Sequence, residues 1–275
     1  MKKTYRRAFI EITNNCNLSC AFCASSSRPR SEMTLELFEK AAAQAGELAE
    51  VVSLHLLGEP LTHSAFPAIL AACSRLGLRV NLVTNGTLLG NYPPALFLEK
   101  CLTQVSVSLH SLACLPPERR GPALARLAAF ALAKPPGLLI GFRLRAEEED
   151  DFYRESVKAL LAHFKTTAAP GPDYVRLADR VFLNFGGLFD WPGGDGGRPK
   201  SGCLGLRHHF GVLSDGRVVP CCADFDGALA LGNINERPLA EILSAPAALS
   251  LRDSIAGKTP MPAFCASCGF TAPDS

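Results

Sequence analysis

The stretch AFIEITNNCNLSCAFC, residues 8 to 23, joins a short apolar run to three cysteines spaced C-x3-C-x2-C. The run favours a strand, so the cysteines are expected to leave a strand end. Three thiols on one short loop can converge on a metal centre, and sulfur ligands favour zinc or an iron–sulfur cluster. Structural zinc is closed by four protein ligands, whereas three leave one position open. We expect Cys16, Cys20 and Cys23 to hold an open metal centre.

Length and charge exclude several classes of protein. The chain has 275 residues, of which 48% are apolar, which suffices for a large core in one domain or in a main domain with an appendage. Its 28 Lys and Arg are balanced by 26 Asp and Glu, so neither nucleic acid nor a membrane is an expected partner. The basic N-terminus is no signal peptide, because Glu11 interrupts its apolar stretch. We expect a cytoplasmic protein.

Eleven cysteines are too many for ordinary packing in a reducing compartment, where disulfides are rare. Cys73, Cys101 and Cys114 are scattered singly through apolar patterns and are assigned no chemistry. A C-terminal group contains Cys203, Cys221, Cys222, Cys265 and Cys268. Four thiolates of this group would satisfy zinc or an iron–sulfur cluster equally well, and taken alone they favour zinc.

Strand-like runs alternate with segments of helical period up to residue 185. This alternation predicts an α/β fold with a parallel sheet or partial barrel, whose active site lies at the carboxyl ends of the strands. The expected strands are 8–13, 51–57, 78–84, 104–110, 138–145 and 174–183, and the expected helices are 34–50, 64–77, 94–101, 118–133 and 151–164.

The composition changes at residue 186. Residues 186–202 are rich in Gly and Pro and indicate a linker. Two strand-like runs around Asp215-Gly216 then predict a hairpin, and a helix at about 238–252 leads to the last cysteines. We therefore expect two domains, residues 1–185 and residues 186–275.

The cysteine loop resembles the signature of the radical S-adenosylmethionine superfamily, in which an aromatic residue, here Phe22, precedes the last cysteine. The resemblance implies a partial (β/α)6 barrel and a [4Fe-4S] cluster whose free iron binds S-adenosylmethionine. It also implies a 5'-deoxyadenosyl radical that abstracts hydrogen from a substrate, and a flavodoxin- or ferredoxin-like electron donor. The organic chemistry then belongs to the cofactor.

Two further stretches match the same superfamily. LHLLGEPL resembles its G-G-E motif with Leu57 in place of the first glycine, which implies that Gly58 and Glu59 contact the cofactor and that Glu59 accepts hydrogen bonds from its amino group. LVTNG resembles the next cofactor segment and implies roles for Thr84 and Asn85. Alone, each would be an ordinary turn. Ser108, Arg143 and Arg145 are further candidates for cofactor contacts.

The C-terminal cysteines resemble the Twitch extension, the short form of the SPASM domain. The pattern is a cysteine, a glycine followed four residues later by a second cysteine, a GNI segment at 232–234 and a C-x2-C pair. It implies an auxiliary [4Fe-4S] cluster held by Cys203, Cys221, Cys265 and Cys268. Nearly the whole chain resembles the compact Twitch enzymes that oxidise an aminocyclitol alcohol, the 2-deoxy-scyllo-inosamine dehydrogenases.

Three functions remain open at this point: modification of a peptide by a maturase or epimerase, oxidation of a small alcohol, and a non-enzymatic electron carrier or zinc-stabilised binding module. The first strand begins near residue 8 and leaves no room for a separate leader-binding domain, which weakens the peptide reading. Cys222 should point away from the cluster of Cys221, because neighbouring side chains of an extended segment face opposite ways. It is either a buried free thiol or, if the product is an epimer, the hydrogen donor.

Overall fold

A single mixed sheet organises the computed structural model, which describes residues 3–192 and 203–270. The strand order is β10-β9-β8-β1-β2-β3-β4-β5-β7-β6, and the strands from β8 to β7 run parallel to one another. The strands are β1 (Tyr5–Ile10), β2 (Ala49–Leu54), β3 (Val80–Thr84), β4 (Leu102–Ser108), β5 (Leu139–Arg143), β6 (Tyr174–Ala178), β7 (Val181–Asn184), β8 (His209–Val212), β9 (Arg217–Val219) and β10 (Gly232–Asn233).

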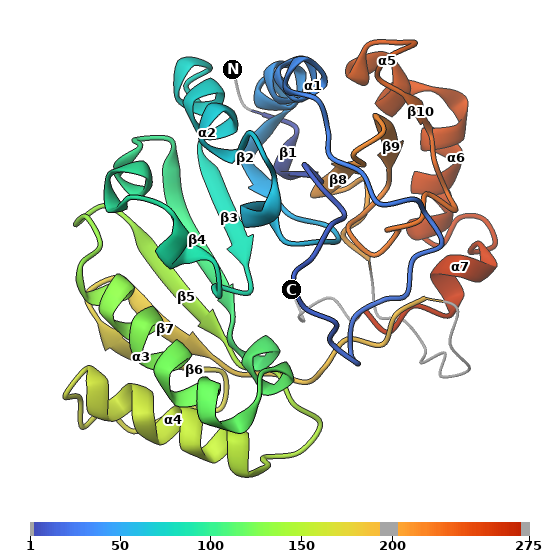
Figure 1. Cartoon of the computed structure of the whole chain (residues 1–275). Coiled ribbons are helices and arrows are strands. Elements are labelled where there is room, and N and C mark those ends of the chain that lie inside the picture. Colours follow the sequence, from blue (N-terminus) through green and yellow to red (C-terminus); the bar gives the residue numbers. More distant parts are fainter. Residues whose placement is uncertain (1–2, 193–202, 271–275) are drawn as a thin grey trace.

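Four helices cover the outer face of the sheet (Figure 1): α1 (Leu35–Leu48), α2 (Phe66–Arg75), α3 (Pro117–Leu132) and α4 (Asp151–His163). Thr34 caps α1 by accepting a hydrogen bond from the amide of Leu37, and Asp150 caps α4 through the amide of Tyr153. The sheet and the apolar faces of these helices enclose the main core. The expected α/β partial barrel is confirmed.

The sixth expected strand was wrong in detail. Residues 174–183 form two antiparallel strands, β6 and β7, and only β7 continues the parallel sheet beside β5. The polar pair Asp179-Arg180 makes the turn, and Arg180 has a φ of 54°. The left-handed backbone of Arg180 departs from the extended conformation of a strand, and the chain reverses there.

Two helix predictions also need correction, and proline is the reason in both. Residues 94–101 give only the short 3-10 helix Pro94–Leu98, which follows Pro93. The helix expected at 238–252 is two helices, α5 (Leu239–Ser244) and α6 (Pro246–Ile255). Ala245 between them has a ψ of 156°, because a proline disfavours the helical conformation in the residue before it.

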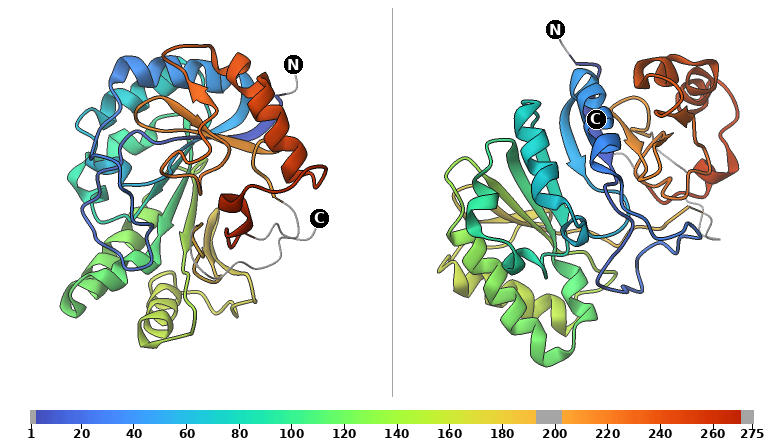
Figure 2. Two further views of the ribbon diagram at one scale, coloured as in Figure 1. Left: turned by 90° about the vertical axis from the view of Figure 1, so that its right-hand side faces the viewer. Right: turned by 45° about the horizontal axis from the view of Figure 1, so that its top comes forward.

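The C-terminal hairpin is confirmed and joins the main sheet. Strands β8 and β9 pair antiparallel around Asp215-Gly216, where Gly216 has a φ of 86°. β8 also pairs in parallel with β1, so the C-terminal elements extend the sheet on the side of its first strand. Helices α5, α6 and α7 (Ala263–Ala266) lie beyond the hairpin (Figures 1 and 2). Of the expected linker at 186–202, only residues 186–192 are described.

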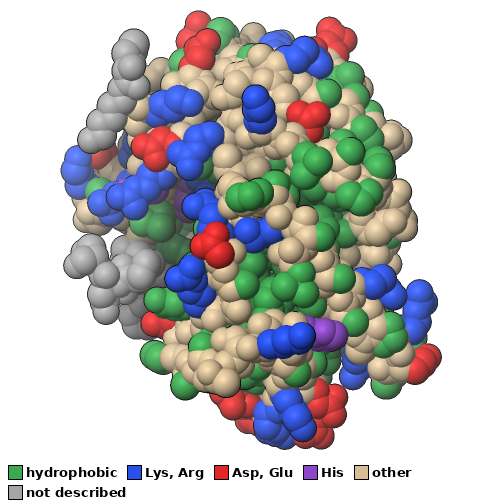
Figure 3. Space-filling view, turned by 90° about the vertical axis from the view of Figure 1, so that its left-hand side faces the viewer, with side chains coloured by type: hydrophobic (Ala, Val, Ile, Leu, Met, Phe, Trp, Pro, Cys, Tyr) green, Lys and Arg blue, Asp and Glu red, His purple; other side chains and the backbone are tan. Residues whose placement is uncertain are grey.

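Two features of the described residues concern charge and hydropathy. Lys and Arg side chains are interspersed with Asp and Glu on the face shown in Figure 3. Among the residues with described structure, none of the helices has both the length and the apolar character needed to cross a membrane.

Candidate active site

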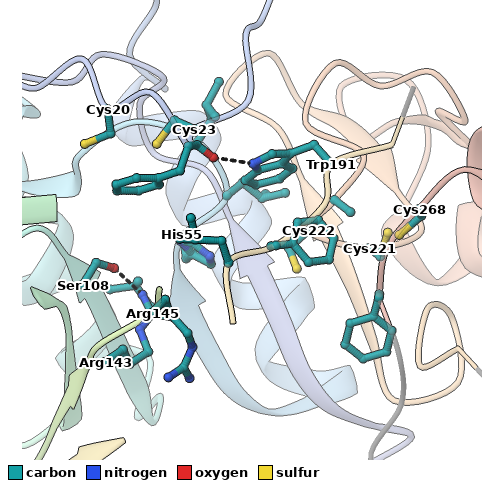
Figure 4. A pocket seen from close by; sticks show the side chains of 18 of the residues that line it. Cys20, Cys23, His55, Ser108, Arg143, Arg145, Trp191, Cys221, Cys222 and Cys268 are labelled. Atoms are coloured by element: carbon teal, nitrogen blue, oxygen red, sulfur yellow. Dashed lines mark hydrogen bonds between the residues drawn. The ribbon is translucent and has the colours of Figure 1, made fainter. Parts of the chain in front are cut away.

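A cavity of about 360 Å³ lies at the carboxyl ends of β1 to β5, and residues of the C-terminal part line it as well. Figure 4 shows cysteines of the N-terminal loop on one side of it and C-terminal cysteines on the other, with His55 and Cys222 between them. All the expected site residues line this one pocket: Cys16, Cys20, Phe22, Cys23, Gly58, Glu59, Thr84, Asn85, Ser108, Cys203, Cys221, Cys222, Cys265 and Cys268.

The cysteine loop leaves β1 and is closed on itself by Asn14. The Asn14 side chain donates to the carbonyl of Pro29 at 2.8 Å and accepts from the amide of Ser31 at 2.7 Å. Thr13 adds a hydrogen bond from its hydroxyl to the carbonyl of Ser31. These bonds fix both ends of the loop, so the three cysteines are carried on a closed segment directly after a strand.

Within the loop, the thiols interact with one another and with the third strand end. Cys16 Sγ accepts a hydrogen bond from the amide of Leu18 at 3.4 Å and is contacted by the Asn85 amide group at 4.0 Å. A hydrogen bond from Cys20 lowers the pKa of Cys23 to about 7. Cys20 also contacts Cys114, to which the sequence assigned no chemistry.

Gly58 allows the second strand end to approach the cysteine loop. Its φ is 77°, and a Cβ at this position would lie 2.5 Å from the carbonyl oxygen of Thr13. The adjacent amide of Glu59 donates to the carbonyl of Asn15 at 2.7 Å. Only glycine tolerates both the left-handed backbone and this close contact, so Gly58 has a structural role beside the cofactor role expected for it.

Glu59 is a buried carboxylate with one acceptor position to spare. It is 1% exposed and accepts hydrogen bonds from the amide of Leu61 at 3.1 Å, the hydroxyl of Thr84 at 2.7 Å and the amide of Asn85 at 2.6 Å. Burial raises its pKa. A carboxylate offers about four acceptor sites, so one remains for a ligand in the pocket. A ligand ammonium group would fit this position.

Arg143 brings an incompletely satisfied guanidinium to the pocket. Its Nη2 donates to Ser108 Oγ at 2.6 Å, while its buried Nε has no hydrogen-bond partner among the described residues (Figure 4). Burial, followed by the neighbouring Arg145, lowers the pKa of Arg143 to about 10. It still carries its charge at neutral pH. An anionic ligand group would complete its hydrogen bonding.

The C-terminal cysteines approach one another around Gly205. A Cβ on Gly205 would lie 3.5 Å from Cys203 Sγ and 3.6 Å from Cys221 Cβ, so the glycine permits these two cysteines to face the same space. Cys265 and Cys268 lie at the short helix α7, and the amide of Cys268 donates to the carbonyl of Cys265. Burial raises the pKa of Cys221.

Cys222 lies on the barrel side of its segment. It packs against the small apolar cluster that contains Phe9 and Leu56, and burial raises its pKa to about 11. Cys221 instead lies beside Gly205 and Cys203. Cys222 therefore presents a protonated thiol to the central pocket at neutral pH.

Sequence reasoning missed several aromatic and basic residues that line the pocket. Trp191 donates from its indole nitrogen to the carbonyl of Phe22 at 2.9 Å, and Phe22 packs on His110 with ring centroids 4.8 Å apart. His55 and His209 also line the cavity. For His55 a signal existed, because it directly follows the second strand and lies two residues before Leu57, the first position of the expected cofactor motif. Trp191 lies in the expected linker, where no sequence pattern indicated a site residue.

The donor atoms fit iron–sulfur clusters by their chemistry. Soft thiols are the ligands such clusters require, and seven of the pocket's cysteines come in a set of three and a set of four. Within residues 3–192 and 203–270, no three Cys, His, Asp or Glu side chains lie close enough together to hold one metal ion. The structure thus shows convergence on one pocket, and the individual ligand assignments stay predictions.

Two family descriptions match the chain. "Radical SAM superfamily" matches residues 10–129, and "Iron-sulfur cluster-binding domain", the SPASM domain, matches residues 203–269. The chain belongs to the radical SAM superfamily and carries a SPASM domain. The radical SAM domain implies a [4Fe-4S] cluster and S-adenosylmethionine, and the SPASM domain implies additional iron–sulfur binding. Zinc, which the C-terminal cysteines favoured when taken alone, is therefore not the metal that this domain implies.

Individual relatives are similar over different lengths. The PqqA peptide cyclase of Streptomyces rochei is 40% identical over 81 residues, which span 28% of this chain and only 22% of that protein. BtrN in complex with AdoMet and 2-DOIA has a TM-score of 0.60 at 19% identity, over 98% of this chain and 95% of BtrN. Streptococcus suis SuiB bound to precursor peptide SuiA has a TM-score of 0.62 at 16% identity, over 97% of this chain and 70% of SuiB. These likenesses confirm the fold.

Proposed function

We propose that this chain is a radical SAM enzyme that cleaves S-adenosylmethionine reductively and abstracts hydrogen from a substrate bound between its two sets of cysteines. One observation carries the proposal: the cysteine loop, the Glu59 carboxylate and the unsatisfied Arg143 guanidinium all face the same pocket as the C-terminal cysteines. An electron carrier or a zinc-stabilised binding module would not need a buried carboxylate and an unsatisfied guanidinium beside the cysteine loop.

The first set of residues would hold the cofactor. Cys16, Cys20 and Cys23 ligate a [4Fe-4S] cluster, which with S-adenosylmethionine supplies an electron and a 5'-deoxyadenosyl radical when both are bound. Glu59 accepts hydrogen bonds from the amino group of the cofactor in its remaining acceptor position. Arg143, held by Ser108, binds the carboxylate through its free Nε. The cofactor is thus held at both charged ends of its methionine part.

Four further residues shape the rest of the cofactor site. Asn85 is tied to Asn17 at 3.0 Å and to the Thr87 hydroxyl at 2.7 Å, so its position relative to the cysteine loop is fixed. Thr84 orients Glu59, Gly58 allows the close approach, and Phe22 forms an apolar wall with His110. This packing would exclude water from the reacting atoms.

The C-terminal part would hold an auxiliary [4Fe-4S] cluster through Cys203, Cys221, Cys265 and Cys268. We propose the domain division 1–185 and 186–275, the second part being the cluster domain. A flavodoxin- or ferredoxin-like protein would supply electrons, and a cytoplasmic location would keep the thiols reduced.

A peptide is the substrate class that we favour. A relative that is 40% identical over 81 residues is named a peptide cyclase, and SuiB is similar in fold and has been captured with a precursor peptide. The small-alcohol alternative rests on the resemblance of the motifs to the 2-deoxy-scyllo-inosamine dehydrogenases. BtrN, which has been captured with AdoMet and 2-DOIA, is similar in fold to this chain over nearly the full length of both. The two readings differ in whether the hydrogen leaves a peptide residue or an alcohol carbon.

Isotope transfer distinguishes these readings. Reconstituted protein is incubated anaerobically with S-adenosylmethionine, dithionite and either a deuterated peptide pool or a deuterated aminocyclitol, and 5'-deoxyadenosine is analysed by mass spectrometry. Label from the peptide pool supports the favoured function, and label from the aminocyclitol supports the alternative. Absence of 5'-deoxyadenosine under all conditions would contradict the radical mechanism itself.

A further inference from the structure

Arg145 is the second guanidinium of the pocket and has no part in the cofactor contacts proposed above. It lies two residues after the end of β5 and lines the cavity together with Arg143. In Figure 4 both arginines lie near Ser108, across the pocket from Cys221 and Cys268. Arg145 therefore adds a positive charge on the side of the proposed cofactor and away from the C-terminal cysteines.

The protein holds one nitrogen of the Arg145 guanidinium and leaves one edge of the group free. Nη1 donates to the carbonyl of Leu144 at 3.2 Å and to that of Asn184 at 3.0 Å. A Cβ on Gly186 would lie 3.3 Å from Cζ and Nε of Arg145, so this glycine allows the guanidinium to lie against the backbone. Nε and Nη2 have no hydrogen-bond partner among the described residues. These two nitrogens share one edge of the planar group and match the two oxygens of a carboxylate.

This free edge is open to a ligand. Among the described side chains, fully buried nitrogens without a partner are found in Arg28 and Arg143, and neither free nitrogen of Arg145 is one of them. Nε and Nη2 of Arg145 therefore keep accessible surface although the side chain is half-buried. A ligand in the pocket can reach them.

No carboxylate of the described protein balances Arg145. It takes part in none of the ion pairs found within residues 3–192 and 203–270. Glu59 is the only carboxylate among the described side chains that line the pocket. The lining histidines His55, His110 and His209 are neutral at pH 7, because burial lowers their pKa values to about 3, 4 and 4. The pocket itself thus has one negative and two positive side chains.

The proposed cofactor contacts leave Arg145 without an anion. Glu59 faces the amino group of S-adenosylmethionine, and Arg143 faces its carboxylate. We infer that Arg145 binds a carboxylate of the substrate through Nε and Nη2. The inference rests on the proposed function and specifies its substrate class as an acidic peptide, in which the carboxylate belongs to a side chain or to the C-terminus. An aminocyclitol carries a protonated amine at neutral pH, which Arg145 would repel.

The surroundings of Arg145 place this carboxylate beside the cofactor. Burial is the main reason for the low pKa of His110, and the charges of Arg143 and Arg145 lower it further, so both guanidinium groups lie near this ring. The ring packs on Phe22 of the cysteine loop. A substrate anchored at Arg145 would therefore have the atoms next to its carboxylate close to the cysteine loop, where hydrogen is abstracted.

A rival arrangement must be separated from this one. The carboxylate of the cofactor would then bridge Arg143 and Arg145, both of which the sequence had made candidates for cofactor contacts. In that arrangement loss of Arg145 weakens the binding of S-adenosylmethionine, and the charge of the substrate has no effect. Separate affinities for the cofactor and for charged probes distinguish the two arrangements, and neither measurement depends on electron transfer.

The test is calorimetric titration of the reconstituted full chain without reductant, first with S-adenosylmethionine alone and then, in the saturated protein, with four probes. N-acetyl-glutamate α-amide has a side-chain carboxylate, N-acetyl-alanine has a terminal carboxylate, N-acetyl-glutamine amide is neutral and N-acetyl-lysine amide is cationic. Arg145→Gln is compared with Arg145→Lys, which keeps the charge but not the edge with two nitrogens. Arg176→Gln is the matched control, because Arg176 on β6 is 61% exposed and pairs with Asp179, and neither lines the pocket.

We expect one carboxylate probe to bind at least about tenfold more tightly than the neutral amide, a preference typical of a charge-assisted hydrogen bond. The cationic probe should bind most weakly. Which carboxylate binds identifies its source in the substrate. Arg145→Gln should lose this preference and keep its affinity for S-adenosylmethionine, Arg145→Lys should retain part of the preference, and Arg176→Gln should retain all of it.

Several results would overturn the inference: equal binding of all probes, binding of none, tightest binding of the lysine amide, or an unchanged preference in Arg145→Gln. A loss of affinity for S-adenosylmethionine in Arg145→Gln would also overturn it, because Arg145 would then belong to the cofactor site. Failure of the wild-type protein to bind S-adenosylmethionine would contradict the proposed function, and the inference with it. The first titration thus distinguishes a failure of the function from a failure of the inference alone.

Discussion

Arg28 Nη2 and Glu11 Oε2 form an ion pair of 2.7 Å that is closed to solvent, with side-chain exposures of 8% and 0%. The Glu11 carboxylate also accepts hydrogen bonds from the hydroxyl and amide of Ser214 in the C-terminal hairpin. Ser26 of the cysteine loop bonds Asp226 of the same C-terminal part. One buried carboxylate at the end of β1 thus ties the cysteine loop to the C-terminal cluster domain.

Loss of Arg28 should destabilise the whole assembly. In Arg28→Met the buried Glu11 charge stays without its partner, which typically costs about 3–5 kcal/mol of the free energy of unfolding. Arg154→Met is the control. The side chains of Arg154 and its ion-pair partner Asp151 are 60% and 90% exposed, so this ion pair should contribute less than about 1 kcal/mol to the free energy of unfolding. Anaerobic denaturant unfolding, followed by the fluorescence of the single tryptophan, measures both. Equal losses in the two variants would contradict a role for burial.

The cysteine sets should separate in an iron assay. Reconstituted wild-type protein is expected to hold about eight irons, the sum of two four-iron clusters. Replacing Cys16, Cys20 and Cys23 together by Ala should remove about half of the iron and all cleavage of S-adenosylmethionine. Cys73→Ala is the control, since this buried thiol lies in the main core. About four irons with one zinc in the wild type would refute the auxiliary cluster.

Glu59→Gln should weaken cofactor binding without loss of iron. The change removes the negative charge that faces the amino group of S-adenosylmethionine, and a charge-assisted hydrogen bond contributes about 1.5–3 kcal/mol, or roughly ten- to hundredfold in affinity. Both quantities are measured on the same sample: the affinity for the cofactor by equilibrium binding, and the iron content by iron analysis. Glu32→Gln is the control, because Glu32 accepts from Ser64 away from the pocket. Loss of iron in Glu59→Gln would show a disrupted fold in place of the proposed contact.

Cys222 and Cys221 should respond differently to the same substitution. Cys221→Ala should lose the auxiliary cluster, whereas Cys222→Ala should keep both clusters and still form 5'-deoxyadenosine, since its thiol lies on the barrel side. If the product is an epimer, Cys222→Ala should also fail to incorporate solvent deuterium, as measured by mass spectrometry of the product. Undiminished turnover in Cys222→Ala would make this cysteine a core residue and favour the dehydrogenase reading.

The sequence alone was sufficient wherever the information is local. The C-x3-C-x2-C spacing, Gly58-Glu59 and Thr84-Asn85 could be assigned because each lies within a few residues of a recognisable strand end. Their convergence on one pocket follows from the parallel sheet, in which all carboxyl ends meet at one edge. The errors arose where a local apolar pattern was continuous but a turn or a proline interrupted it, as at Arg180 and Pro246.

The tertiary structure decided what depends on partners distant in sequence. Glu11 was notable in the sequence only as an interruption of an apolar run, yet it binds Arg28 and Ser214, which lies 203 residues away. Arg7 and His209 became neighbours only because β8 pairs with β1, a pairing that no local periodicity encodes. Burial and charge balance are properties of the assembled pocket. The class of protein could therefore be recognised from short motifs, whereas the buried contacts of Glu11 that join the cysteine loop to the C-terminal part became visible only in three dimensions.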